Sequence, residues 1–448
     1  MRLLRRILLG LLVLVVVAAV GGYWYERPLL LTGTGYAAHN ACAVEHIAGR
    51  DDPEDDLPPN PLVPVLRTKQ TDDGATKGML VGGLAAQKAY PTEGYGCTLA
   101  DAAPDLPPPT PVDATGNPFT AATPPTADPA LDAAIATAFG DDLAADDKAD
   151  LGTRAVLVVH DGDLVAERYA DGFDADTPQL GWSMTKSVTS LLVGRLVQEG
   201  VVTLDDDHLR PEWTDRRADI TVEELLRMTS GLAWDETYAL GTPITRMLYL
   251  EPDMGGYVAS QPAAHDPGTY QQYSSGSTTL LCDILAEKTG EGADLPRQQL
   301  FAPLGLSSFV VEPDASGTPV CSSYGWATPR DWAALGQFAL QNGEWNGQQL
   351  LPDDWMATTT TAIDVTTEED GYGAGWWVNR RPDGTLVHPE LPEDTYFAEG
   401  HDGQWIVVVP SYDLVVVRMG FSPTVDDEGV PALAAAVIAT LPAPGAGG

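Results

Sequence analysis

Ser183 stands three residues before Lys186, and this pair is the first pattern in the sequence that suggests chemistry. Apolar residues recur at helical spacing after the lysine as far as Val197, and Gly200 ends the run. Positions i and i+3 share one face of a helix, so both side chains would project into the same space. A serine hydroxyl becomes an effective nucleophile when a neighbour takes its proton, and a buried lysine can do so. We therefore predict Ser183 as nucleophile and Lys186 as base, although the pair alone also fits a lysine that is only a solvated helix charge.

Tyr273, in the stretch Tyr273-Ser274-Ser275, is a second candidate for proton transfer. A tyrosine phenol in a loop can relay protons when a neighbouring ammonium lowers its pKa. The alternative interpretation is an ordinary half-buried tyrosine.

A third stretch, Gly-His-Asp-Gly-Gln from Gly400 to Gln404, opens a strand-like run. Glycine permits a close approach of the backbone, so the Gln404 N–H is expected to face a substrate carbonyl. Together with the Ser183 N–H it would form an oxyanion hole. A plain strand start is the alternative. The tripeptide His-Asp-Gly of this stretch also occurs at residues 160–162. That earlier copy fits a hairpin turn and precedes the nucleophile in the chain, so we reject it as the site.

The charge balance is strongly acidic, with 64 Asp and Glu residues against 25 Lys and Arg and a formal net charge of −39. A field of this sign repels nucleic acid and anionic membranes, so no nucleic-acid partner is expected. A solvated acidic surface is the simplest explanation. The seven histidines show no metal-ligand spacing, which disfavours a zinc hydrolase. A lipase of the α/β-hydrolase type is disfavoured because no Gly-x-Ser-x-Gly motif occurs.

Residues 1–25 have the features of a membrane anchor or a signal segment. Three arginines precede a charge-free apolar run of 18 residues from Ile7 to Trp24. Such a run is long enough for a spanning helix, and Tyr23–Tyr25 suit the aromatic belt of an uncleaved anchor. We expect a single-pass anchor with the arginines inside, which makes the rest of the chain extracytoplasmic, either periplasmic or at the cell surface. Cleavage near Gly21 would instead give a secreted protein.

Residues 26–127 form a leader segment rich in Pro, Asp, Thr and Ala, whose proline runs interrupt regular structure. Cys42 and Cys97 lie here, and paired cysteines outside the membrane tend to oxidise. We predict a Cys42–Cys97 disulfide that staples a segment with little core of its own. Cys282 lies in an apolar helical run and reads first as a core residue, and whether it pairs with Cys321 stays open.

Residues 128–448 have the pattern of a packed domain of the α/β (α+β) class. Strands are predicted at 154–160 and 164–169, before the nucleophile helix. A capping box from Thr221 to Glu224 opens a helix through Met228 in a middle of mixed helix and loop. Strand-like runs and a last helix follow at 375–378, 396–399, 404–409, 414–419 and 430–441. The simplest fold is one antiparallel β-sheet from both chain ends, flanked by helices, with an inserted mostly helical lobe and the site in the cleft between them.

In this order, Ser183-Met-Thr-Lys186, Tyr273-Ser-Ser275 and His401-Asp402-Gly403 resemble the motifs of the class C β-lactamase-related serine hydrolases. That family includes penicillin-binding proteins, esterases and 6-aminohexanoate-dimer hydrolases. The resemblance extends over about residues 131–441 and implies a β-lactamase/transpeptidase-like fold. It implies Ser183 as the acylated nucleophile, Lys186 as base and Tyr273 as proton relay, with no metal or cofactor. The substrate would contact Ser275, His401, Asp402 and Gly403.

The sequence departs from the β-lactamase pattern at two places. Ser275 stands where those enzymes usually have asparagine, and His401-Asp402 replaces Lys-Thr. Lysine and threonine there would bind a substrate carboxylate, whereas an ionised Asp402 that faces the cleft would repel it. We therefore expect weak or no β-lactamase activity, and a neutral or cationic small-molecule ester or amide as the substrate.

Two classes of function stay open. The first is a serine hydrolase that works through an acyl-enzyme, either a carboxylesterase or a short-amide hydrolase. The second is a membrane-anchored binding or sensor module on a retained penicillin-binding-like fold, acylated slowly or not at all. The intact Ser183, Lys186 and Tyr273 favour the first. The sequence gives neither the natural substrate nor the oligomeric state.

Overall fold

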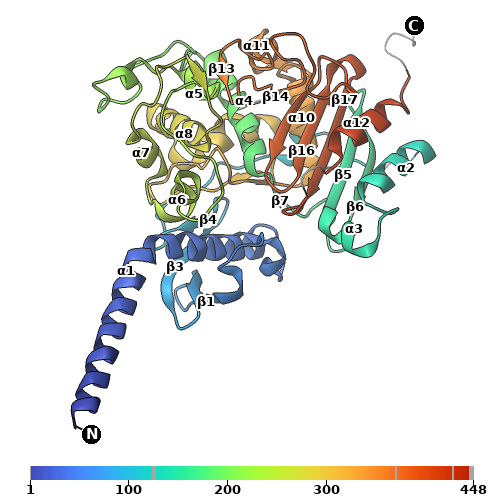
Figure 1. Cartoon of the computed structure of the whole chain (residues 1–448). Helices are drawn as coiled ribbons and strands as arrows, with labels where there is room; N and C mark the ends of the chain where they lie inside the picture. The colour runs from blue at the N-terminus through green and yellow to red at the C-terminus, as the bar shows by residue number, and fades with distance from the viewer. Residues whose placement is uncertain (1, 124–127, 369–370, 426–427, 443–448) are drawn as a thin grey trace.

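A six-stranded antiparallel sheet is the centre of the computed structural model, which describes residues 2–123, 128–368, 371–425 and 428–442. Its strands come from both ends of the catalytic part of the chain, as the sequence predicts (Figure 1). In spatial order they are β14 (Trp377–Val378), β15 (Tyr396–Gly400), β16 (Gln404–Val409), β17 (Leu414–Gly420), β5 (Thr153–His160) and β6 (Asp163–Tyr169).

Both faces of this sheet are buried. Successive side chains of a strand point to opposite faces, so Leu157 and Val159 join one apolar core while Val156 and Val158 join the other. Helices α4 (Thr185–Gln198) and α10 (Pro329–Leu340) belong to the first core, and α2 (Pro129–Ala138) and α12 (Val430–Ile438) cover the second. The nucleophile helix is therefore fixed against the sheet by its apolar stripe.

The middle of the chain forms the expected helical lobe. Thr221 and Glu224 make the predicted capping box, but the helix that they open, α5 (Val222–Leu226), ends two residues before Met228. The other lobe helices are α6 (Pro243–Leu250), α7 (Met254–Ala259) and α8 (Ser275–Thr289). The other α-helices and strands after residue 128 are α3 (Ala145–Leu151), α9 (Ala302–Leu304), α11 (Trp355–Thr359), β7 (Gln179–Leu180), β8 (Tyr270–Gln271), β9 (Val310–Val311), β10 (Gly325–Ala327), β11 (Glu344–Trp345), β12 (Gln348–Gln349) and β13 (Thr366–Thr367).

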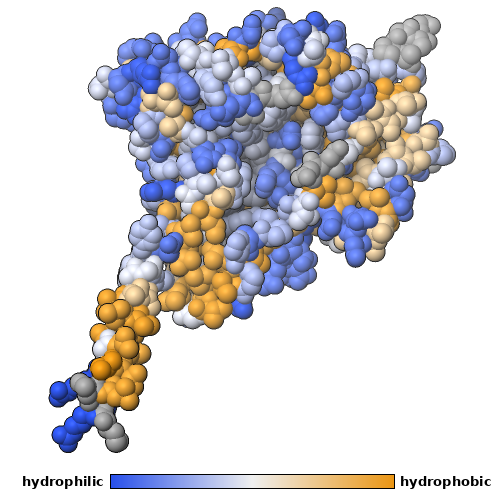
Figure 2. Space-filling model, viewed as in Figure 1, coloured by the Kyte–Doolittle hydropathy of each residue, from blue (hydrophilic) through white to orange (hydrophobic). Residues whose placement is uncertain are grey.

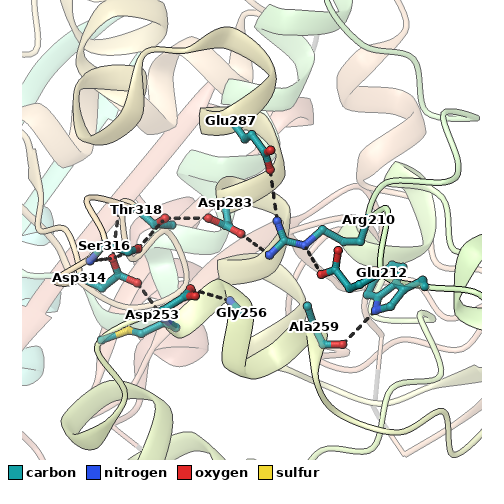
Figure 3. A network of polar contacts seen from close by, with 12 residues as sticks. Arg210, Glu212, Asp253, Gly256, Ala259, Asp283, Glu287, Asp314, Ser316 and Thr318 are labelled. Carbon is teal, nitrogen blue, oxygen red and sulfur yellow. Dashed lines mark hydrogen bonds and ion pairs between the residues drawn. The ribbon is translucent and has the colours of Figure 1, made fainter.

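A polar network fixes helix α8, whose first residue is Ser275 (Figure 3). Asp283 on this helix accepts a hydrogen bond from Thr318 Oγ1 at 2.7 Å and pairs with Arg210 at 2.7 Å. Next to it, Cys282 is bonded to Cys321, so the cysteine that reads first as a core residue is both buried and bridged. These links hold the helix, and with it Ser275, against the loop near residue 320.

The N-terminal helix crosses the expected boundary between anchor and leader. Helix α1 (Arg2–His46) is continuous, with Pro28 inside it. Figure 1 shows the helix changing direction where it reaches the folded part of the chain, as a proline that removes a helix hydrogen bond would cause. The first part of the helix projects away from the domain and is exposed. Residues 31–44 of the same helix are mostly buried against the domain. The last leader residues, 124–127, and residues 443–448 lie outside the described residues.

The leader contains more regular structure than its composition suggests. Strands β1 (Leu66–Gln70), β2 (Thr76–Leu80), β3 (Leu84–Thr92) and β4 (Gly96–Leu99) form an antiparallel sheet that packs on α1. The predicted Cys42–Cys97 disulfide is confirmed, and it joins the helix to β4 in a small core that also includes Trp326 of the catalytic part. The small core of the leader is thus completed by the rest of the chain, which agrees with the expectation of a segment with little core of its own.

A buried ion cluster also joins the leader to the central sheet. Asp56 pairs with Arg50 at 2.6 Å and with Arg154 of β5, and the Phe173 ring lies 4.8 Å from both guanidinium groups. Burial alone would raise the pKa of Asp56, but the two arginines outweigh it and lower that pKa below its ordinary value.

We predict that both disulfides form in the exported protein and stabilise it. The Cys42–Cys97 bridge spans a separation of 55 residues, for which the loop-entropy relation gives about 4 kcal/mol. Replacing both Cys42 and Cys97 by serine should lower the melting temperature, and intact-mass analysis should show four cysteines blocked to alkylation before reduction. Free alkylation of Cys42 and Cys97 in the native protein would contradict the bridge.

Candidate active site

Ser183 lies in a tight turn at the start of helix α4. The turn, Trp182–Met184, is a single 3-10 turn, and Trp182 has a positive φ of +46°. A positive φ is costly for a residue with a large side chain, and such strain concentrates at functional sites. The turn places Ser183 at the N-terminal end of α4, where backbone N–H groups lack partners and the helix dipole favours negative charge.

The ammonium of Lys186 lies in a buried polar cage. Its Nζ is 2.9 Å from Ser183 Oγ, 2.8 Å from Ser275 Oγ and 3.1 Å from the carbonyl oxygen of Ser322. Only 2% of the residue is exposed, so the helix-charge alternative does not describe it. Burial lowers the pKa of Lys186 to about 8, although Glu236 works in the opposite direction. A substantial neutral fraction near neutral pH gives this amine the capacity to take the serine proton.

Glu236 is a member of the site that the sequence did not reveal. Its Oε2 accepts hydrogen bonds from the Trp234 indole at 2.5 Å and from the Ser275 N–H at 2.9 Å. Its Oε1 accepts from Ser275 Oγ, so a hydrogen-bonded chain runs from Lys186 through Ser275 to a carboxylate. Glu236 lies in an irregular loop before α6, without periodicity or a recognised motif, and only the folded chain brings it to Lys186.

Tyr273 lies over the site, but its pKa moves opposite to the expected direction. The Lys186 Nζ is 4.7 Å from the centre of its ring, and the ring stacks on Trp377 at 5.3 Å. Burial raises the pKa of Tyr273 well above its ordinary value; Tyr372 and Glu236 add to this, and the hydrogen bond with Ser183 only partly offsets it. The phenol is therefore neutral, and it can pass a proton as a hydroxyl but does not serve as a stored phenolate base.

The turn between β15 and β16 closes the other side of the site. Residue 400 pairs with residue 404 across this hairpin. A Cβ on Gly400 would sit 2.1 Å from the Gly181 carbonyl oxygen, so only glycine lets the strand end approach the nucleophile turn. His401 and Gly403 line the cleft with Ser183, and the His401 ring stacks on Tyr238 at 4.6 Å.

Two predicted site residues face the protein interior instead of the cleft. Ser275 is fully buried between Lys186 and Glu236, which gives it a positioning contact in place of the expected substrate contact. The Gln404 side chain donates to the Gly420 carbonyl at 2.6 Å and the Asp402 carbonyl at 3.0 Å. Gln404 is not among the described residues that line the cleft, but the expected oxyanion donor is its backbone N–H, which these side-chain contacts do not test and which stays a prediction.

Asp402 does not meet the condition for repelling a substrate carboxylate. Its side chain is only 1% exposed, although the residue borders the cleft, and its backbone has a φ of +61°. Burial raises the pKa of Asp402, while His401 at 3.4 Å and Arg154 work against the rise. Neither carboxylate oxygen accepts a hydrogen bond from any residue that the structure describes.

Other carboxylates give the cleft its charge. The cleft has a volume of about 290 Å³, and Glu236, Glu399 and Glu428 lie on its wall. Neither lysine nor arginine occurs among the described lining residues, and His401 is the basic group there. Across the described chain, no group of three or more His, Cys, Asp or Glu side chains is placed to hold a metal ion.

The geometry agrees with a known sequence family. The sequence model of the family described as Beta-lactamase matches residues 141–438, about two thirds of the chain. This chain belongs to the beta-lactamase family. The 6-aminohexanoate-dimer hydrolase of Paenarthrobacter ureafaciens is 24% identical over 307 residues, covering 61% of this chain and 74% of that protein. A penicillin-binding protein homolog from Caulobacter crescentus superimposes with a TM-score of 0.55 at 20% identity, over 70% of this chain and 99% of the homolog, which shows the shared fold.

Family membership makes this protein a beta-lactamase-family serine hydrolase and confirms the predicted fold class. The matched region contains the turn with Ser183, the lysine cage and the β15–β16 hairpin. The leader from α1 to β4 lies outside the matched residues. Its packing against the catalytic part is therefore a feature to be explained from this chain alone.

We predict that acylation depends on the protonation state of Lys186. The rate should rise with pH and level off near the pKa of about 8, because only the neutral amine takes the serine proton. Glu236→Gln removes a charge that stabilises the ammonium, so the rising limb should move to lower pH. The measurement is kcat/KM for an ester against pH. Glu428→Gln, a cleft carboxylate without a role in the Lys186 shift, is the matched control and should leave the limb in place. A limb that does not move in Glu236→Gln would contradict this assignment.

We predict that Asp402→Asn stabilises the fold at neutral pH. The folded-state pKa of this carboxyl is raised above its ordinary value of 3.8. The stability that the protonated Asp402 carboxyl contributes is therefore fully present below pH 3.8. It is lost as the pH rises through the folded-state pKa, because the buried carboxyl then ionises. Asparagine tolerates a positive φ and carries no charge, so the gain should reach about 1–3 kcal/mol at pH 7 and vanish below about pH 4. Denaturant unfolding at both pH values measures it, and an equal effect at both would contradict an ionised buried carboxylate.

Proposed function

We propose that this protein hydrolyses small neutral or cationic esters or short amides through an acyl-enzyme on Ser183. The observation that carries the proposal is the 2.9 Å contact between Ser183 Oγ and a buried lysine whose pKa is lowered to about 8. The serine would attack the substrate carbonyl as Lys186 takes its proton, and Tyr273 and Lys186 would return a proton to the leaving group. Water would then release the acid from Ser183. A module that only binds its ligand would have no need of this buried, partly neutral amine.

The charges of the cleft support a neutral or cationic substrate. The carboxylates of Glu236, Glu399 and Glu428 lie on its wall, and no described lysine or arginine there would pair with a substrate carboxylate. A β-lactam or a D-alanine terminus carries such a carboxylate, so like-charge repulsion works against efficient turnover of either. The repulsion of a substrate carboxylate that the sequence analysis assigned to Asp402 is thus assigned here to Glu236, Glu399 and Glu428. A short amide stays a candidate alongside esters because a relative is named for hydrolysis of the 6-aminohexanoate dimer.

We further propose that α1 anchors the enzyme on the outer face of a membrane. Within the described residues, one helix, Leu4–His46, is long and apolar enough to span a bilayer. Its charge-free part, 18 residues from Ile7 to Trp24, measures about 27 Å as a helix, close to the hydrocarbon thickness. Two disulfides suit an oxidising compartment. Retention of the full-length chain in carbonate-washed membranes would support the anchor, and release of a chain that begins near residue 22 would show a cleaved signal.

Ser183→Ala tests the function most simply. It should abolish labelling by a fluorophosphonate and turnover of p-nitrophenyl butyrate, and Lys186→Ala should lower kcat/KM by about a thousandfold or more, since nucleophile activation and proton return are both lost. Ser260→Ala, at the end of α7 and outside the cleft lining, is the control. A fluorescent penicillin should label the wild-type enzyme much more weakly than the fluorophosphonate does. Wild-type turnover in Ser183→Ala would overturn the proposal.

A further inference from the structure

A second, larger cavity adjoins the catalytic cleft on the side of the N-terminal helix. It has a volume of about 800 Å³, within the range of sites for small organic ligands. Helix α1 contributes Leu29 and Tyr36, the leader contributes its proline run 58–61, and the catalytic part contributes Leu240 and Tyr249. Its wall is thus built by the leader, including the buried part of α1, and by the catalytic part, and it is mainly apolar, in contrast to the acidic cleft.

The cavity lies beside the turn that carries the nucleophile and shares side chains with the catalytic cleft. Trp182, the residue before Ser183, lines it, and the stacked pair of Tyr238 and His401 lies on the walls of both the cleft and the cavity. The Trp182 ring also meets the His401 ring edge to face at 6.0 Å. These rings are the wall that the cleft and the cavity share, and a substrate with its carbonyl at Ser183 would reach the cavity by passing its apolar chain beside them.

The same cavity lies next to the expected membrane surface. Leu29 follows Trp24, the end of the apolar run, by five residues, which corresponds to about 7.5 Å along a helix. At this level the Tyr23 hydroxyl accepts a hydrogen bond from the Ala85 N–H at 3.1 Å. The turn before Ala85 exposes Val81 by 56% and Leu84 by 50%.

These exposed side chains make an apolar rim beside the anchor. Figure 2 shows apolar surface on the domain next to the upper end of the projecting helix. Trp24 and Tyr25 are exposed on that helix at the same level, as in the aromatic belt of a membrane protein. An anchored domain that rests on this rim would hold the cavity at the depth of the lipid headgroups.

From this arrangement we propose that the cavity is an acyl-chain site, which receives long-chain esters from the bilayer and presents their carbonyl to Ser183. The inference rests on the proposed hydrolase function and on the anchor. Ser183 Oγ bonds to the carbonyl carbon, the bond to the alcohol oxygen breaks, and the serine proton passes through Lys186 to that oxygen. Water then cleaves the acyl-enzyme and releases the fatty acid. The substrate class is thus a membrane amphiphile with a neutral ester group and a long apolar chain.

The test uses the full-length chain in phosphatidylcholine vesicles, with p-nitrophenyl dodecanoate and p-nitrophenyl butyrate as substrates. Burial of each added methylene favours the longer ester by up to about fourfold, so the dodecanoate-to-butyrate ratio of kcat/KM should be at least ten. Leu240→Asp introduces a charge into the cavity, and Leu240→Trp fills it; each should lower that ratio at least tenfold. Leu143→Asp, at a leucine that is 45% exposed and outside the cavity lining, is the matched control and should keep the ratio. Adding vesicle lipid at a fixed bulk ester concentration should slow the dodecanoate reaction, because the ester is diluted in the bilayer.

The outcomes separate the cavity from the chemistry. Butyrate hydrolysis without a preference for dodecanoate, or equal changes of the ratio in Leu240→Asp and Leu143→Asp, would overturn the acyl-chain site. If added vesicle lipid does not change the rate of dodecanoate hydrolysis, the ester does not reach the site from the bilayer, and that part of the proposal is overturned. If neither ester is hydrolysed, the proposed function fails and binding decides the cavity: in Ser183→Ala, methyl 11-bromoundecanoate should quench tryptophan fluorescence more than methyl undecanoate does. Loss of that difference in the Ser183→Ala, Leu240→Asp double variant supports the site, and no difference to begin with overturns it.

Discussion

The burial of one amine, Lys186, is the constraint on which the site depends. An ammonium enclosed by Ser183, Ser275 and the Ser322 carbonyl has lost most of its hydration, and that loss shifts its equilibrium toward the neutral base. The cage requires α4 and α8 to be fixed relative to each other. The sheet and its cores hold the first helix, and the Cys282–Cys321 bridge with the Asp283 network holds the second.

The carboxylate of Glu236 sets how far this shift goes. It opposes the effect of burial on Lys186, and through Ser275 it orders the hydrogen bonds around the amine. Too little opposition would lower the pKa until proton return to a leaving group becomes weak, and too much would keep the amine charged. Burial is the main cause of the raised pKa of Tyr273, and the same carboxylate adds to it, which helps to keep the phenol neutral beside Ser183. One acidic residue from an irregular loop therefore acts on both proton-transfer groups.

The sequence predicted the parts of the fold and site that follow local rules. The strand-like runs 404–409 and 414–419, the capping box at Thr221 and the helix after Ser183 agree closely with the structure, because strand runs, helical periodicity and capping are local signals. The position of Glu236 and the burial of the Asp402 side chain depend on loop geometry, which no periodicity records. The sequence did not predict the strands of the leader. These strands pack in a core that includes α1 and Trp326, and composition does not show a partner that lies far along the chain.

The pKa of Lys186 is the quantity that tests the mechanism most directly. The chain has only six lysines, so a sample with ¹³C-labelled lysine gives few Cε resonances to follow with pH, and Lys186→Met identifies the one in question. We predict that this resonance titrates near 8 and moves to lower pH in Glu236→Gln. A Lys186 resonance that titrates near the ordinary lysine value of about 10.4 would contradict a buried base and, with it, the proposed catalytic mechanism.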